Sequence, residues 1–333
     1  MADPVDSLGE FFSPDGITVT SASYPTNETS RQLLKNQDLA GVNNLLHKRQ
    51  LTPTDQQPVV RMNRDTYYSL AVVDVSKGAT ITIPELPEGK YVSVQPVTED
   101  HRIQPMFYGA GTFELTTHIG DHLYLVVRLD STFSEAEAAK YQDQMSLSAK
   151  SNKKFTAEPV NKESFERVEN ELKAKMPGIA KRDGKDATFG MFTAPNDASN
   201  RLFTQEKYEV GAAIGWAGAQ KIDNIYEISG NYPSNTPHQA TFQDPKNGAF
   251  WSITVYNKSG FMFNDLANIS SNTAKPNDDG SYTINFGGGK DALNNIEIAN
   301  DSGVFNLAVR HYKPSELVSE KGFRILPTVK AAK

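Results

Sequence analysis

The fold of this chain is decided by a stretch of nine residues, Arg61-Met-Asn-Arg-Asp-Thr-Tyr-Tyr-Ser69. The residues on either side, Val59-Val60 and Leu70-Ala-Val-Val-Asp-Val75, have the apolar character of a strand in a sheet core, so the pattern predicts that the strand runs through the whole stretch. Asn and Asp are depleted in strands because their short side chains compete for backbone hydrogen bonds. A polar stretch inside an apolar strand therefore predicts a functional site or a structural polar cluster.

Length and composition describe a folded protein with room for two domains. The chain has 333 residues and a net charge of −6, which gives no basic face for nucleic acid. No apolar run approaches the ~20 residues of a membrane helix. Cysteine is absent, which excludes disulfides, a cysteine nucleophile and thiolate metal sites.

The order of predicted secondary structure is β-rich, then helical, then β-rich. We divide the chain into a partly helical N-terminal segment (1–55) packing on a first β domain (56–132), a helical region (133–222) and a C-terminal β domain (223–330). Short strands punctuated by Gly, Pro and Asp favour a sandwich or barrel. The predicted strands cover residues 72–75, 80–83, 91–97, 112–117, 122–129, 225–228, 250–256, 281–286 and 304–312. The predicted helices cover 31–47, interrupted by Gly41, 134–140, 161–175, ended by Pro177-Gly178, and 202–219.

The N-terminal half resembles the family known as domain of unknown function 1254 (DUF1254), and the C-terminal half resembles DUF1214. The first resemblance rests on residues 59–69 and on Leu86-Pro-Glu-Gly-Lys-Tyr91. The second rests on three motifs: Ala249-Phe-Trp-Ser-Ile-Thr-Val-Tyr256, Asn277-Asp-Asp-Gly-Ser281 and Arg310-His-Tyr-Lys-Pro314. The resemblance implies two β-sandwich or jelly-roll-like domains joined by a helical region. It also implies a periplasmic or secreted protein, with a cytoplasmic location as the alternative.

One segment departs from the family. Relatives usually carry an Asn-Trp-Leu-Pro-like segment before the last strand, where this chain has Asn294-Asn-Ile-Glu-Ile-Ala299. If that segment lines a pocket in the relatives, the pocket of this chain has a different shape.

The polar stretch supplies the first candidate site. Alternate residues of a strand share a face, so Arg61, Asn63 and Asp65 are predicted to point the same way. Asp65 is then a candidate base, Arg61 and Asn63 candidate substrate ligands, and Tyr68 a candidate proton donor. The alternative is a buried ion pair between Arg61 and Asp65 that fixes the meeting of two domains.

Histidines suggest a second site. His118 and His122 have the spacing of a helical zinc site, but Gly120-Asp121 between them indicates a hairpin turn, on which two imidazoles need not converge. No metal ligands are therefore assigned. Glu99-Asp-His-Arg102, after a predicted strand, offers His101 as a proton donor and Arg102 as a substrate ligand; the alternative is a solvated turn.

A third candidate lies near the C-terminus. Arg310 and Tyr312 share one face of a predicted strand, and Trp251 and Tyr256 belong to a neighbouring strand. Aromatic rings with an arginine can form a floor for a planar ligand, although core packing is the commoner role of a tryptophan such as Trp251.

Two hypotheses for function follow. The first is a hydrolase-like enzyme that acts on a small polar or aromatic molecule in a cleft between the β domains. The second is a non-catalytic ligand-binding or interaction protein in which the polar cluster is structural. No phosphate loop or nucleophile elbow is present and no cofactor is evident, while the histidines leave a metal ion open. A small-molecule ligand is the expected partner, and self-association is left open.

Overall fold

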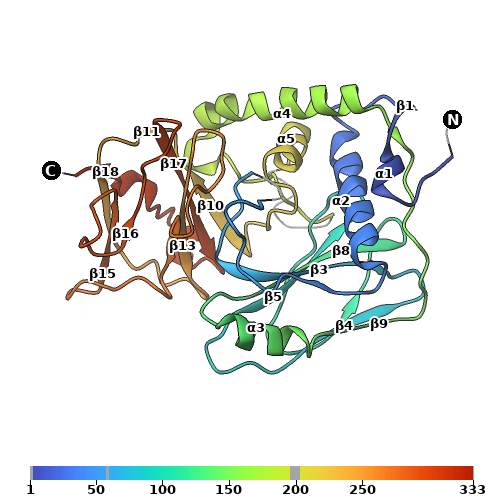
Figure 1. The fold of residues 1–333 in the computed structure, drawn as a ribbon, viewed down its shortest axis with the longest axis horizontal. Coiled ribbons are helices and arrows are strands. Elements are labelled where there is room, and N and C mark those ends of the chain that lie inside the picture. Colours follow the sequence, from blue (N-terminus) through green and yellow to red (C-terminus); the bar gives the residue numbers. More distant parts are fainter. Residues whose placement is uncertain (1–2, 58–59, 196–202, 333) are drawn as a thin grey trace. The chain divides into compact units, whose positions relative to one another are not determined.

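The computed structural model describes residues 3–57, 60–195 and 203–332, and the chain forms two compact units. The first unit contains residues 1–49 and 68–221, and the second contains residues 50–67 and 222–333. The protein is mainly β, with several antiparallel sheets and six α-helices among the described residues (Figure 1). None of the described helices combines the length and the apolar character needed to cross a lipid bilayer.

A five-stranded sheet forms the centre of the first unit. Its strand order is β2-β3-β8-β5-β6, and every residue of β5 and β8 is buried. A separate three-stranded sheet has the order β7-β4-β9. The strands of this unit are β1 (Phe12–Ile17), β2 (Leu46–His47), β3 (Thr66–Asp74), β4 (Ala79–Ile83), β5 (Val92–Thr98), β6 (Phe107–Tyr108), β7 (Gly111–Leu115), β8 (His122–Asp130) and β9 (Ser146–Ala149).

Three helices of the first unit, α2 (Tyr24–Ala40), α4 (Lys162–Asp183) and α5 (Gln205–Gly215), pack on one another on one side of its large sheet (Figure 1). Gly211 of α5 allows close packing, because a Cβ atom there would lie 2.8 Å from Met191. The short helices are α1 (Leu8–Phe11) and α3 (Glu135–Gln142), and a 3-10 turn covers Gly184–Asp186. Ser134 caps α3 through a capping box with Glu137, as a good N-cap predicts.

The second unit is a sandwich of two sheets. One has the order β10-β17-β13-β14 and the other the order β16-β15-β12-β18. A core that includes Trp251, Phe286 and Phe305 fills the space between them. The elements are β10 (Asn224–Ile228), β11 (Tyr232–Pro233), β12 (His238–Gln243), β13 (Trp251–Tyr256), β14 (Asn268–Ser270), β15 (Ser281–Phe286), β16 (Asn295–Ile296), β17 (Val304–Tyr312), α6 (Glu316–Ser319), a 3-10 turn (Leu326–Thr328) and β18 (Lys330–Ala331).

Three predictions of secondary structure are wrong in part. Strand β3 begins only at Thr66, because residues 61–65 form a turn and a bend and Arg61 has a φ of 59°. The predicted alternation of faces therefore does not apply to residues 61–65, and Val59 lies outside the described residues. Helix α4 continues past Pro177 and ends at Gly184 (φ 55°). Proline removes one helical hydrogen bond, but Pro177 is exposed and the helix continues without that bond.

The predicted helix over 31–47 is correct only as far as Ala40, because the chain leaves the helix at Gly41 and residues Leu46–His47 form β2. Strands β15 and β17 have the predicted bounds, and α2 ends at Gly41. The predicted helix over 202–219 forms α5 from Gln205, whereas residue 202 lies outside the described residues.

Candidate functional site

The carboxylate of Asp65 is buried in the second unit and accepts three side-chain hydrogen bonds. Its Oδ2 atom accepts from the Ser252 hydroxyl at 2.7 Å and from the Tyr312 hydroxyl at 2.7 Å. Its Oδ1 atom accepts from Asn268 Nδ2 at 2.5 Å. Only 2% of Asp65 is exposed, and the backbone N–H of Asp65 donates to the Asn63 side chain at 3.0 Å. Asn63 therefore shapes the turn before Asp65.

The arginine beside Asp65 is Arg310, whereas the predicted alternation of faces pairs Asp65 with Arg61. The Nη1 atom of Arg310 lies 4.0 Å from Asp65 Oδ2 and donates to Thr254 Oγ1 at 3.0 Å. Its Nη2 atom donates to the Arg61 carbonyl and to the Tyr256 hydroxyl, both at 2.8 Å. The left-handed backbone at Arg61 accounts for the difference, since it breaks the strand geometry on which the prediction depends.

Arg61 itself lies at the edge of this cluster. Its Nη1 atom donates to Asn306 Oδ1 at 3.1 Å, and its guanidinium lies 5.7 Å from the centre of the Tyr256 ring. Burial lowers the pKa of Arg61, and the neighbouring charge of Arg310 lowers it further, while Tyr256 opposes the change. The guanidinium still remains protonated at neutral pH.

The cluster occupies one face of the sheet β10-β17-β13-β14. Ser252, Tyr256 and Arg310 belong to this face, because Ser252 pairs with Arg310 and Tyr256 pairs with Asn306 across β13 and β17. Trp251 points to the opposite face, where it is fully buried against the Phe242 and Tyr282 rings. Among the predicted ligand-binding residues, Trp251 is thus a core residue separated by the sheet from Tyr256, Arg310 and Tyr312.

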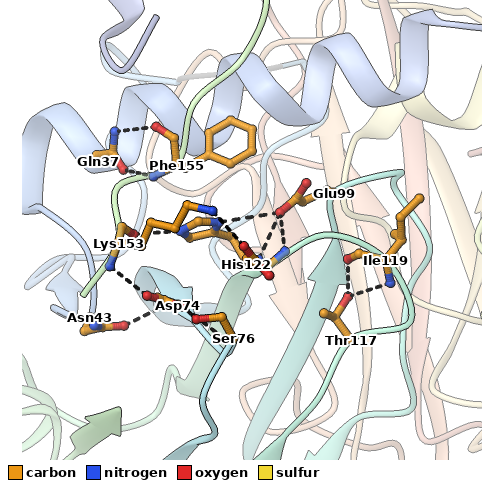
Figure 2. A network of polar contacts seen from close by, with 11 residues as sticks. Gln37, Asn43, Asp74, Ser76, Glu99, Thr117, Ile119, His122, Lys153 and Phe155 are labelled. Carbon is orange, nitrogen blue, oxygen red and sulfur yellow. Dashed lines mark hydrogen bonds and ion pairs between the residues drawn. The ribbon is translucent and has the colours of Figure 1, made fainter. Parts of the chain in front are cut away.

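In the first unit, the two predicted histidine-bearing motifs contact each other. Glu99 accepts from the backbone N–H groups of Asp121 and His122, at 3.0 and 2.9 Å. Asp100 lies 2.9 Å from His118 Nε2. The segment between β7 and β8 is a connection between two sheets and not the predicted hairpin turn, because β7 pairs with β4 and β8 pairs with β5. The loop that follows β5 holds this connection, and Figure 2 shows Glu99 beside His122.

His122 and Asp74 anchor the segment that joins β9 to α4 (Figure 2). His122 Nε2 lies 2.8 Å from the Lys153 carbonyl, and the Lys153 N–H donates to Asp74 Oδ2 at 2.7 Å. Burial alone would lower the pKa of His122, but the Glu99 carboxylate and the Lys153 carbonyl raise it above its ordinary value. Burial alone would raise the pKa of Asp74, but hydrogen bonds from Ser151, Ser76 and the Lys153 N–H lower it well below its usual range. The contacts therefore favour the charged form of each group.

His101 is buried rather than solvated. Its exposed fraction is 1%, its φ is 59°, and its ring stacks on Trp216 with centroids 6.0 Å apart. Its Nε2 atom accepts from the Ala217 N–H at 3.0 Å. Burial lowers the pKa of His101 to about 3, with Asp100 opposing and Arg102 reinforcing the change. The imidazole is therefore neutral at physiological pH.

The remaining predicted site residues also belong to the first unit. Arg102 donates to the Ala194 carbonyl at 2.9 Å, and its guanidinium lies over the Phe203 and Tyr208 rings. The Tyr68 ring lies 5.9 Å from the Arg128 guanidinium. Tyr68, His101 and Arg102 thus lie in one unit and Asp65 in the other.

Two features were not predicted from the sequence. Trp216 donates to Thr29 Oγ1 at 2.9 Å and stacks on His101. His47 Nδ1 lies 2.7 Å from the Ser69 hydroxyl, because His47 and Ser69 face each other across β2 and β3. The contact therefore links β2 to β3, and Ser69 is buried there, with 2% of the residue exposed. Only the strand register brings the pair together, and no sequence motif marks it.

Among the described residues, no group of three or more His, Cys, Asp or Glu side chains is placed to hold a metal ion. His118 and His122 bind different carboxylates, Asp100 and Glu99.

Comparison with known proteins places both halves of the chain in described families. Residues 42–147 match the family model "Protein of unknown function (DUF1254)", and residues 230–316 match "Protein of unknown function (DUF1214)". None of the curated protein sequences compared with the chain matches it.

Two solved structures share the fold. The VPA0106 protein of Vibrio parahaemolyticus is 15% identical, with a TM-score of 0.67 over 94% of this chain and 98% of that one. A putative uncharacterized protein from Burkholderia cenocepacia is 13% identical, with a TM-score of 0.54 over 94% of this chain and 86% of that one. At such identities the likeness concerns the fold alone. The chain therefore carries a DUF1254 domain over residues 42–147 and a DUF1214 domain over residues 230–316.

Proposed function

We propose that this protein is a non-catalytic binding protein in which the Asp65 cluster is structural. The observation that carries the proposal is the engagement of both carboxylate oxygens of Asp65 by Ser252, Asn268 and Tyr312. A general base needs an accessible lone pair within hydrogen-bond reach of the substrate. Three donors and 2% exposure leave Asp65 poorly suited to that task.

The second predicted catalytic group supports the same proposal. His101 is neutral at physiological pH, is 1% exposed, and uses its Nε2 lone pair to accept from the Ala217 N–H. It is therefore poorly suited to donate a proton to a substrate near pH 7. Asp65 and His101 are thus poor candidates for a base and a proton donor, and this favours the binding hypothesis over the hydrolase hypothesis.

The Asp65→Asn variant tests the proposal. It keeps the size of the side chain and replaces one acceptor oxygen by a donor, which then faces a donor of the cluster. Breaking a buried charged hydrogen-bond network costs about 3 kcal/mol. We expect the free energy of unfolding, measured by urea denaturation, to fall by about that amount.

The same preparations are assayed against ester, phosphomonoester and glycoside substrates. We expect no turnover from the wild type. Turnover that Asp65→Asn abolishes while the melting temperature is unchanged would overturn the proposal. The matched control is Asp278→Asn, an exposed acid of the second unit, and we expect little change in its stability.

A further inference from the structure

The backbone of Arg61 is held in a conformation that arginine rarely adopts. Its φ of 59° lies in the left-handed region, which costs a residue with a Cβ atom about 1–2 kcal/mol. The N–H of Arg61 donates to the Gly260 carbonyl at 2.8 Å, and its carbonyl accepts from Arg310 and Tyr256. Strain that neighbouring groups maintain in this way is concentrated at functional sites.

The Arg61 guanidinium is held only by neutral groups. It donates to Asn306 Oδ1 and lies over the Tyr256 ring, and no carboxylate of the described residues lies within 4.0 Å of it. Arg310 contributes a second positive charge to the same cluster, whereas Asp65 contributes the negative charge and lies beside Arg310. The cluster thus carries a surplus of one positive charge at Arg61.

The groups around Arg61 suit a small polar ligand. Arg61 is partly exposed, and the loop beside it carries Asn257, whose carbonyl accepts from Asn306. Asn306 also donates to Asn231, which is exposed. The side-chain amides of Asn231 and Asn306, the backbone carbonyl of Asn257 and the Arg61 guanidinium therefore meet where the loops leave β13 and β10. A guanidinium presents a planar fork of N–H donors that matches a carboxylate with two parallel hydrogen bonds.

We propose that Arg61 is an anion-binding residue that takes the carboxylate group of a small monoanionic molecule. The inference rests on the proposed binding function and adds the site and the ligand class. The planar fork can bind a carboxylate or a phosphate group. The preference for a carboxylate comes from its charge, because a single negative charge balances the surplus of the cluster, whereas a phosphate monoester carries about −1.5 to −2 at pH 7. Tyr256 and Asn306 fix the guanidinium in advance, which reduces the entropy lost on binding.

The experiment is a ligand-observed NMR titration of the full chain in a chloride-free buffer at pH 7, with acetate, benzoate and inorganic phosphate as probes. For Arg61→Gln we expect the Kd of the bound carboxylate to rise at least tenfold. For Arg61→Lys, which keeps the charge and loses the fork, we expect a smaller rise. Lys258→Gln is the matched control, because it removes one exposed positive charge from the same loop, and its Kd is expected to stay within twofold.

Three outcomes overturn the inference. They are an unchanged Kd in Arg61→Gln, the absence of carboxylate binding to the wild type, and tighter binding of phosphate than of carboxylate. The melting temperature of each variant without ligand is measured alongside, so that a loss of fold is separated from a loss of the site. If Arg61→Gln still binds the carboxylate, Arg61 is not the binding residue, but the proposed binding function is not contradicted. Turnover that depends on Asp65 would instead contradict the proposed function itself.

Discussion

At the scale of single residues, Gly120 shows how one missing side chain permits a contact. It has a φ of 68°, and a Cβ atom there would lie 2.2–2.3 Å from the carboxylate of Glu99. That carboxylate accepts from the N–H groups of Asp121 and His122. The connection between β7 and β8 therefore needs glycine for its backbone conformation and also for the approach of Glu99.

Gly120→Ala is expected to destabilise the protein more than Gly89→Ala. Both glycines are exposed and have positive φ, 68° and 78°, but a Cβ at Gly89 would meet nothing within 4 Å. Gly89→Ala should cost about 1 kcal/mol from backbone strain alone. Gly120→Ala adds the loss of the Glu99 hydrogen bonds, about 2 kcal/mol more. Urea denaturation measures both, and equal losses would show that Glu99 contributes nothing to the connection.

For single residues, the sequence predicted which residues are important, but it did not predict which residues they contact. Asp65 stands out because aspartate is rare in strands, and it is indeed the centre of a buried cluster. Its partners Ser252 and Asn268 could not be predicted, because they depend on which strands lie together. The φ of Arg61 likewise has no local signature, since arginine is not a residue that favours the left-handed region.

At the scale of elements, residues 151–155 of the segment between β9 and α4 are held by side chains, whereas residues 157–161 form backbone hydrogen bonds with Val5 and Ile17. The Gln37 amide bonds both the N–H and the carbonyl of Phe155, at 2.8 and 3.1 Å, much as a neighbouring strand would (Figure 2). Asn43 donates to the Ser151 carbonyl at 2.8 Å, and His122 and Asp74 bind Lys153. The stability of this segment therefore depends on the charge states of a few groups.

The contribution of His122 to stability should decrease as the pH rises. Its pKa in the folded protein is raised, so the folded state binds the proton more tightly than the unfolded chain. The stabilisation is complete below the unfolded pKa of about 6.5 and is lost as the pH rises through the folded pKa. The charged groups around His122 are Glu99, Asp74, Asp121 and Lys153.

We expect the difference in melting temperature between wild type and His122→Gln to be larger at pH 6 than at pH 9. Glu99→Gln, which keeps His122 but removes its carboxylate partner, should move the pH at which the stabilisation is lost to a lower value. A difference that stays constant over this range would exclude a charged His122 in the folded protein.

Element types were predictable where the period of the pattern was clear. Strands β15 and β17 and the capped helix α3 follow from alternation and from the Ser134 cap. The prediction failed at Pro177 and at residues 61–65, where a local preference competes with contacts distant in sequence. The turn at residues 61–65 is stabilised by Gly260, Tyr256 and Arg310, none of which is visible from the local sequence.

At the scale of the whole molecule, the compact units do not follow the family boundaries. The DUF1254 match covers residues 42–147, but residues 50–67 belong to the second unit with residues 222–333. Within that unit, Asp65 binds Ser252 and Tyr312, and Met62 packs against the small core that includes Tyr256 and Ala308. A fragment that contains only residues 222–333 therefore lacks residues 50–67, which belong to the same compact unit.

A fragment of residues 222–333 should be much less stable than the same fragment joined through a Gly/Ser linker to residues 50–67. Without Asp65, the buried Arg310 loses its nearby carboxylate, and removing one partner of a buried ion pair costs about 3–5 kcal/mol. Urea denaturation of both fragments measures the difference. Equal stability would mean that the polar stretch contributes nothing to the sandwich.

The long separation between Asp65 and its partners also affects synthesis on the ribosome. Residues 50–67 leave the ribosome well before β13 and β17 exist, so the polar stretch has no folded partner for much of translation. Its docking closes a very long loop, which carries an entropic cost and slows folding. The second unit can be completed only after Tyr312 has emerged from the ribosome. Until then its apolar strands are exposed to aggregation and are candidate sites for chaperone binding.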